Sequence, residues 1–273
     1  MKYVTPYLET ERLFLKRGSK EDYRKVYEYD FTKLRDIAGE FEYVKLSLDD
    51  IEGFDTYALE YDNVYDWIRS SGAHMFRSTG DIIDNWQSVV DLYRSQMEKG
   101  PYGAPGCFND LDMLIVGMNG SGNVGRGGCN YTEYLTHFAI WSMFNSPLMI
   151  GCDIRNMTAE TLKILTNKDL ISINQDEEGR QPYLAHNNWN NTHTWIKPMA
   201  NGEYAIGYFN LSDNRADALL YFHDIGIPVS SGYGLELYDC LSHKKLDGVY
   251  KNYYNTILEP HGCAVFKAKM VKI

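Results

Sequence analysis

Residues 76–97 have the sequence FRSTGDIIDNWQSVVDLYRSQM, and this stretch decides the fold class of the middle of the chain. A short apolar segment ends near Gly80, and apolar side chains then recur at the spacing of a helix. The spacing predicts a helix within Asp81–Met97, with one apolar side made of Ile82, Ile83, Trp86, Val89, Val90, Tyr93 and Met97. A strand that runs directly into a helix is the first half of a β/α unit.

The same order of elements continues downstream. We predict a strand around Met113–Val116, a helix opened by Thr132, a strand at PLMIGCDI (147–154), and a helix capped by Thr158 that runs toward Ile173. Pro147 should end the second helix, because proline lacks the backbone N–H that a helix interior needs. Alternation of strands and helices favours parallel β/α units.

The pattern changes near Gln181. Short strand-like runs follow, broken by Asn, Gly, Asp and Pro: HTWIKPM (193–199), EYAIGYFNL (203–211), ADALLYFHD (216–224), GLELYDCL (234–241), YKNYYNTILEP (250–260) and GCAVFKAKM (262–270). Such spacing predicts an antiparallel β-sandwich that buries a core of its own. Ahead of the β/α part, a strand (TERLFLKR, 10–17) and a helix (SKEDYRKVYEYD, 19–30) are expected. We therefore divide the chain into residues 1–66, 67–181 and 182–273.

Composition excludes several classes of function. The 273 residues carry a net charge of −10, which argues against nucleic acid or an anionic membrane as the main partner. No apolar run is long enough to span a membrane, and the start lacks the apolar core of a secretory signal, so a cytoplasmic location is expected. The five cysteines form no CxxC pair, which disfavours zinc and a disulfide framework. The 22 Tyr and five Trp suit either a sugar site or ordinary packing.

Acidic residues occur where strands of the β/α part are expected to end. Arg77 and Asp81 flank Gly80 at a strand-to-helix junction, and Asp110 and Asp112 stand ahead of an apolar run. In parallel β/α architectures such positions face the catalytic mouth, where carboxyl groups can protonate a leaving group. The alternatives are structural. Asp81 would cap the following helix, Asp110 and Asp112 would form turns, and Arg77 would be an ion-paired surface residue.

Four segments in order carry a family resemblance: GAHMFRSTGDIIDNW (72–86), GCFNDLDMLIVGMNG (106–120), EYLTHFAIWSMFNSPLMIGCDIRNM (133–157) and LKILTNKDLISINQD (162–176). Residues 64–273 thereby resemble the C-terminal part of an α-galactosidase (melibiase) of glycoside hydrolase family 27. The resemblance implies a (β/α)₈ barrel followed by a β-sandwich, α-galactosides as substrates and no cofactor. It also implies that Asp81 is the general acid/base, that Arg77 binds substrate, and that Asp112 and Met113 contact the galactose.

The nucleophile of this retaining family has no convincing counterpart. Asp62 lies in a similar Tyr-Asp-Asn, but Glu60 and Val64 replace the lysine and cysteine of the family pattern. Asp62 also precedes Asp81 by only 19 residues, too few for the strand and helix that should intervene. We do not expect Asp62 to be the nucleophile. The fold class is therefore α/β, with the last three β/α units of a barrel and a sandwich. The chain as given should hydrolyse α-galactosides poorly, and its open barrel edge should favour association, for example as a homo-oligomer.

The beginning of the chain resembles another family. YLETERLFLKRGSKEDYRKVYEYDF (7–31) is similar to the first strand and helix of GNAT-superfamily acetyltransferases, which bind acetyl-CoA at a Gly-rich turn. GNVGRGG (122–128) has a comparable glycine spacing, but it lies inside the glycosidase resemblance, and we interpret it as a loop. Three hypotheses follow: an α-galactosidase, an acetyltransferase fragment, and a fusion without catalysis.

Overall fold

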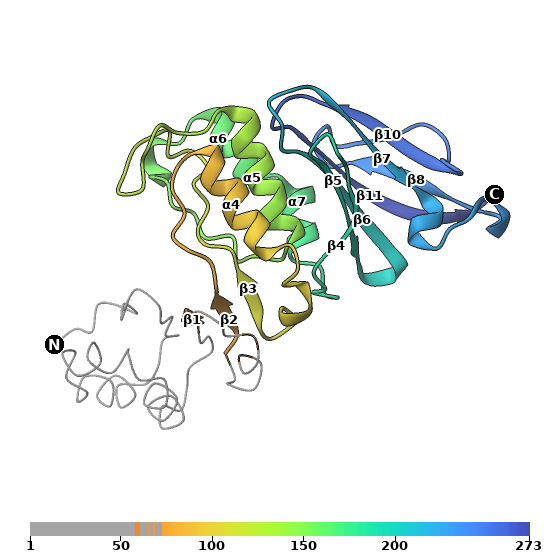
Figure 1. Cartoon of the computed structure of the whole chain (residues 1–273), viewed down its shortest axis with the longest axis horizontal. Coiled ribbons are helices and arrows are strands. Elements are labelled where there is room, and N and C mark those ends of the chain that lie inside the picture. The colour runs from red at the N-terminus through yellow and green to blue at the C-terminus, as the bar shows by residue number, and fades with distance from the viewer. Residues whose placement is uncertain (1–57, 61–64, 66–67, 69–72) are drawn as a thin grey trace. The chain divides into compact units, whose positions relative to one another are not determined.

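The computed structural model describes residues 58–60, 65, 68 and 73–273 (Figure 1). The chain forms two compact units, Met1–Ser78 and Thr79–Ile273. The strand and helix expected at 10–17 and 19–30, and with them the acetyltransferase-like segment, lie outside the described residues.

The described part of the first unit is a pair of parallel strands. β1 (Ala58–Glu60) pairs with β2 (Met75–Arg77), and Glu60 stands opposite Arg77. Phe76 of β2 is buried, and the ring of Tyr65 meets it edge-on while the Tyr65 hydroxyl donates to Ser78 Oγ at 2.6 Å. The parallel pairing is the arrangement expected of β/α units.

The second unit begins with helices and one short strand (Figure 1). Its elements are α4 (Trp86–Gln96), η2 (Gly100–Tyr102), β3 (Phe108–Asp110), α5 (Tyr131–Met143), η3 (Ile154–Asn156), α6 (Ala159–Leu165) and α7 (Lys168–Asn174). The single helix expected from Thr158 to Ile173 is two helices. Thr158 does cap the first, but the side chain of Asn167 accepts from the N–H groups of Asp169 and Leu170 and starts a second.

Two expected strands, Met113–Val116 and 147–154, are not formed as such. They meet in a single parallel bridge between Leu114 and Ile150. The apolar run was misleading because Leu114, Ile115 and Val116 are all buried, so the run reports burial in the core and not a strand. The strand of this region lies earlier, at β3.

The antiparallel β-sandwich is confirmed. A six-stranded sheet has the order β4-β5-β6-β11-β8-β9, and a two-stranded sheet pairs β10 with β7. The strands are β4 (Tyr183–Asn187), β5 (Thr192–Pro198), β6 (Glu203–Asn210), β7 (Ala216–Tyr221), β8 (Tyr233–Asp239), β9 (Lys244–Lys245), β10 (Tyr253–Leu258) and β11 (Cys263–Lys272). Short turns η4 (Ala200–Gly202), η5 (Phe222–Ile225) and η6 (Val229–Ser231) connect them. Strands β4 and β9 were not predicted.

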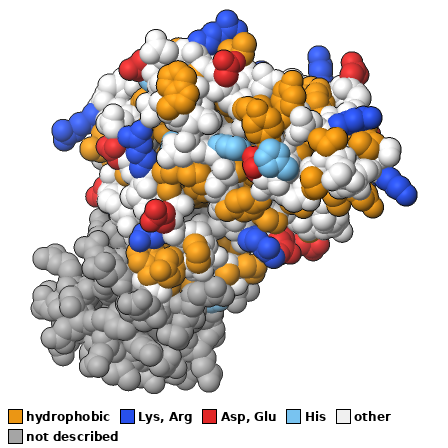
Figure 2. All heavy atoms as spheres, turned by 45° about the vertical axis from the view of Figure 1, so that its right-hand side comes forward, with side chains coloured by type: hydrophobic (Ala, Val, Ile, Leu, Met, Phe, Trp, Pro, Cys, Tyr) orange, Lys and Arg blue, Asp and Glu red, His pale blue; other side chains and the backbone are white. Residues whose placement is uncertain are grey.

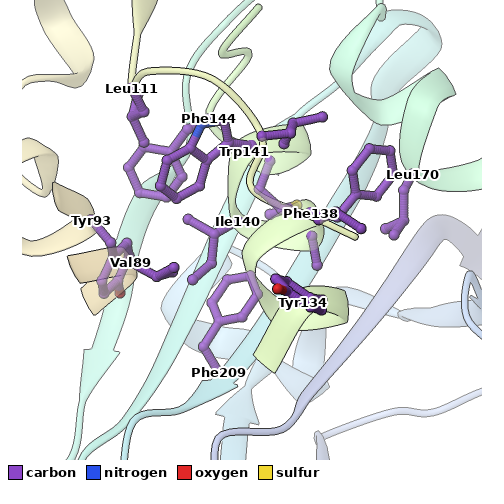
Figure 3. Packing of buried hydrophobic residues seen from close by; sticks show 14 of the residues in the cluster. Val89, Tyr93, Leu111, Tyr134, Phe138, Ile140, Trp141, Phe144, Leu170 and Phe209 are labelled. Atoms are coloured by element: carbon purple, nitrogen blue, oxygen red, sulfur yellow. The ribbon is translucent and has the colours of Figure 1, made fainter. Parts of the chain in front are cut away.

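The six-stranded sheet has a buried core on each face, because neighbouring side chains of a strand point to opposite sides. Ile196, Tyr208 and Phe266 pack against the two-stranded sheet in one cluster. Their immediate neighbours in the sequence, Trp195, Phe209 and Val265, point to the other face and belong to a second cluster with residues of α4, α5 and α7. Figure 3 shows Phe209 beside Ile140 and Tyr134 of α5. The sandwich therefore has the core expected of it, but it is not independent of the helices.

Polar contacts join α4 and α5 to the sandwich as well. The Tyr93 hydroxyl lies 2.5 Å from His193 Nδ1 and accepts from Trp195 Nε1 at 2.6 Å. Burial lowers the pKa of His193 to about 4, so the ring is neutral and its Nδ1 accepts a hydrogen bond from the Tyr93 hydroxyl. In the turn between β10 and β11, His261 stacks on Trp86 and its Nδ1 lies 2.7 Å from Glu133. These contacts explain why residues 79–273 form one unit.

The surface of the described residues has a mixed character. On the face drawn in Figure 2, apolar side chains lie in patches among charged ones, as on most protein surfaces. All five cysteines are free thiols. Among residues 73–273 and the few described before them, no helix is long and apolar enough to cross a membrane. Within the same residues, no group of three or more His, Cys, Asp or Glu could hold a metal ion.

Candidate active site

Asp112 occupies a strained turn directly after β3. Its φ of 85° lies in the left-handed region, which costs a residue with a side chain about 1–3 kcal/mol. The turn is held in place from three sides. Asp110 Oδ1 accepts from the Asp112 N–H at 2.9 Å, Ser146 Oγ accepts from the Leu111 N–H at 2.9 Å, and Trp141 Nε1 donates to the Asp112 carbonyl at 2.7 Å. A strained conformation that is fixed this firmly suggests a functional position.

The buried carboxylate of Asp112 holds the backbone next to Asp81. Asp112 Oδ2 accepts from the Ile82 N–H at 2.8 Å, and Oδ1 accepts from the Met113 N–H at 2.6 Å. The sequence placed Asp112 ahead of a strand, whereas it follows one, at the C-terminal end of β3. That end is the catalytic side of parallel β/α folds. The side chain of Asp81 is exposed.

Asp81 does not cap the following helix. The cap of α4 is Asn85, whose Oδ1 accepts from the Ser88 N–H at 2.9 Å, and the helix begins only at Trp86. The Ile83 N–H donates to Ser88 Oγ at 2.9 Å and so ties down the residues between Asp81 and the helix. The structural alternative for Asp81 is therefore wrong, and its carboxylate is not required to start α4.

Asp84 is a buried carboxylate that the sequence analysis did not single out. Its Oδ1 accepts from the Tyr134 hydroxyl at 2.8 Å, and its Oδ2 accepts from the Gly120 N–H at 2.7 Å. Its backbone N–H donates to Val124 at 2.9 Å, and its carbonyl accepts from Gly128 at 2.9 Å. Burial raises the pKa of Tyr134, and the hydrogen bond to Asp84 adds to the effect, so the phenol stays protonated. Asp84, three residues after Asp81, thereby holds in place the loop that contains Gly120 and Gly128.

The Gly-rich loop at 117–128 wraps around Asp84, which explains its glycines. A Cβ on Gly125 would lie 2.4 Å from the Gly120 carbonyl oxygen, and one on Gly128 would lie 2.8 Å from the Gly120 nitrogen. The Gly120 N–H already donates to a carboxylate of the chain itself. The interpretation of this segment as a structural loop, and not a phosphate site, is the one that its contacts support.

The remaining candidates lie on both units. Arg77 is the half-buried last residue of β2 in the first unit. Met113 is half-buried and follows Asp112, and its Sδ would lie 2.8 Å from a Cβ placed on Gly151, so this glycine leaves room for it. Asp62 and Val64 lie outside the described residues.

Comparisons with known proteins match the two halves of this architecture. Residues 53–176 match the family described as alpha galactosidase A, and residues 189–268 match the alpha galactosidase C-terminal beta sandwich domain. Both regions are melibiase domains. The melibiase match begins inside the segment 1–66, and the comparisons lend no support to the acetyltransferase resemblance.

Relatives of these melibiase domains include an α-galactosidase homologue of Dictyostelium discoideum, 35% identical over 74% of this chain and 50% of its own length. Alpha-galactosidase 3 of Arabidopsis thaliana is 32% identical over 73% of this chain and 44% of its own. A solved α-galactosidase/melibiase homologue from Bacteroides fragilis is 30% identical, with a TM-score of 0.77 over 85% of this chain and 51% of that one. The chain thus spans about half the length of the relatives it matches.

Proposed function

We propose that this chain provides the acid/base half of a retaining α-galactosidase, which hydrolyses terminal α-galactosyl residues. Asp81 would protonate the leaving oxygen and then remove a proton from the attacking water. Asp112 and Met113 would contact the galactose, and Arg77 is proposed as a substrate-binding residue because the family resemblance implies it. The observation that supports this most is the strained turn at Asp112, whose carboxylate accepts from Ile82 beside Asp81.

The geometry accounts for the division of roles between the two acids. Asp81 is exposed and can exchange its proton with substrate and water. Asp112 is buried, and its carboxylate accepts hydrogen bonds from two backbone N–H groups, which fixes its position. We infer that Asp112 positions the loop of Asp81 and contacts the sugar. In this proposal the described β/α elements are the last units of a barrel, with the sandwich after residue 181.

A retaining mechanism needs a second carboxylate, about 5–5.5 Å from the first, that attacks the anomeric carbon. Asp62 is not proposed for that role, for the reasons of sequence given above. The chain alone should therefore bind galactose but turn it over far below the ordinary rate of about 1–1000 per second.

Binding measurements on the full chain test the proposal. Titration calorimetry or ligand-observed NMR should detect galactose, and Asp112→Ala should abolish the signal. Asp91→Ala is the matched control, because Asp91 is an exposed residue of α4 whose carboxylate accepts a hydrogen bond from Gln87 of the same helix. Acetyl-CoA should give no signal. Binding of acetyl-CoA but not of galactose would overturn the proposal in favour of an acetyltransferase.

A further inference from the structure

The segment 111–115 is largely buried but does not form a strand, so its backbone groups need partners other than a sheet ladder. The Leu114 N–H donates to the Met149 carbonyl at 2.7 Å. The N–H groups of Asp112 and Met113 donate to carboxylate oxygens within the turn itself, at 2.9 and 2.6 Å. A buried N–H that lacks an acceptor costs free energy, and the acceptors of this segment therefore decide its conformation.

Side chains of α5 and of the turn after it bind both ends of this segment. Ser146 Oγ accepts from the Leu111 N–H at 2.9 Å. His137 Nε2 accepts from the Ile115 N–H at 3.1 Å. The two residues that contact galactose in the proposed function, Asp112 and Met113, thus lie between two backbone positions that are held from α5 and the turn behind it.

His137 also reaches the strained turn through Trp141. The two residues are four positions apart on α5, so they share one face of the helix. Their rings meet edge-on, with centroids 4.1 Å apart and planes at 74°. Trp141 Nε1 in turn donates to the Asp112 carbonyl at 2.7 Å. Because both rings are fully buried, neither can shift without disturbing its neighbours.

The imidazole of His137 is in the form that can accept from Ile115. Burial lowers the pKa of His137 to about 3, so the ring is neutral near pH 7. A neutral imidazole carries one proton, and because Nε2 accepts, that proton lies on Nδ1. Nδ1 is buried and has no hydrogen-bond partner among the described residues. An unsatisfied group of this kind is costly, which favours a role for His137 beyond filling space.

We propose that His137 and Ser146 are positioning residues of the galactose site, which fix the backbone on both sides of Asp112 and Met113 and so keep the strained turn in its sugar-binding conformation. The inference rests on the proposed function in one respect, because it takes Asp112 and Met113 as the galactose contacts. A residue with a φ of 85° keeps this conformation only while its surroundings hold it there.

The experiment measures galactose affinity by titration calorimetry and amide hydrogen exchange by NMR, both on the full chain. His137→Leu removes the acceptor of the Ile115 N–H and lowers the fraction of chains in the binding conformation. The dissociation constant for galactose should therefore rise about tenfold, and the Met113 amide should exchange faster. His137→Gln keeps a side-chain acceptor and should bind galactose more tightly than His137→Leu.

Thr136→Val is the matched control on the same helix. Thr136 is also fully buried, but its Oγ1 donates to the His261 carbonyl in the turn between β10 and β11. The control should leave galactose affinity and exchange at Met113 unchanged. Ser146→Ala removes the acceptor of the Leu111 N–H, should act like His137→Leu, and replaces it if circular dichroism shows His137→Leu to be unfolded.

The outcomes separate the positioning proposal from the proposed function. Unchanged exchange at Met113 in the folded variants among His137→Leu and Ser146→Ala would overturn the positioning proposal. An equal change in Thr136→Val, or equal affinities of His137→Leu and His137→Gln, would overturn it too, because the role would then be structural only. Faster exchange at Met113 in His137→Leu but not in Thr136→Val, with no galactose binding by the wild type, would leave the positioning role intact and overturn the proposed function.

Discussion

Replacing Asp84 by alanine should strongly destabilise the second unit. The substitution leaves two donors, the Tyr134 hydroxyl and the Gly120 N–H, without their acceptor in a place where Asp84 itself is fully buried. Each unsatisfied buried donor costs about 1–3 kcal/mol, so we expect a loss of about 4 kcal/mol in the free energy of unfolding. For a unit of this size that corresponds to a drop in Tm of about 8–16 °C.

The assay is urea and thermal unfolding of the full chain, followed by circular dichroism and compared with Asp91→Ala. Asp91 is exposed and should cost less than about 0.5 kcal/mol. The loop at 117–128 should also lose protection from hydrogen exchange at Gly120 and Gly128, which bond to Asp84. If Asp84→Ala and Asp91→Ala unfold at the same urea concentration, the role assigned to Asp84 is refuted.

Three further predictions concern the rest of the second unit. Gly125→Ala should lower the free energy of unfolding by about 1–3 kcal/mol, because the new Cβ would lie 2.4 Å from the Gly120 carbonyl oxygen. Gly80→Ala is the control, since a Cβ there has no atom within 4 Å, and equal melting temperatures of the two variants would contradict the prediction. Burial lowers the pKa of His193 to about 4, so on acidification the imidazole of the unfolded chain is protonated before that of the folded chain. The free energy of unfolding should therefore fall as the pH drops from 6.5 toward 4, and an unchanged urea midpoint between pH 7 and 5 would disprove this prediction. Limited proteolysis should spare residues 175–182, because Asp176 accepts from the Ala200 N–H and Lys197 Nζ donates to the Arg180 carbonyl; cleavage there in the native chain would show that the sandwich is a separate unit.

Local patterns in the sequence were enough to place most elements. The apolar spacing of Asp81–Met97 and the alternating runs after Gln181 reflect how side chains meet a core, so a helix and a sandwich could be predicted from them. Short exposed elements could not be predicted, because they bury no apolar side chains. Strand β9 is two exposed lysines, which carry no apolar signal at all.

The candidate site could be predicted only in part. Asp81 and Asp112 could be predicted from their place in the motifs. The sequence analysis put Asp112 before a strand, however, whereas it follows β3. Its position depends on contacts with Ile82 and Trp141, 30 and 29 residues away. Asp84 escaped notice because its partners, Gly120 and Tyr134, lie 36 and 50 residues away. No local pattern in the sequence reports on such pairings.

The most direct test of the central claim is the rate at which the full chain hydrolyses 4-nitrophenyl α-galactoside, measured for the wild type, Asp81→Asn and Asp91→Asn. The measurement is made with and without the unmatched half of the Dictyostelium discoideum homologue. If Asp81 is the acid/base, Asp81→Asn should lower the rate about 10²–10⁴-fold, and Asp91→Asn should leave it unchanged. Equal rates for the wild type and Asp81→Asn in the presence of that half, with hydrolysis well above the background, would contradict the account.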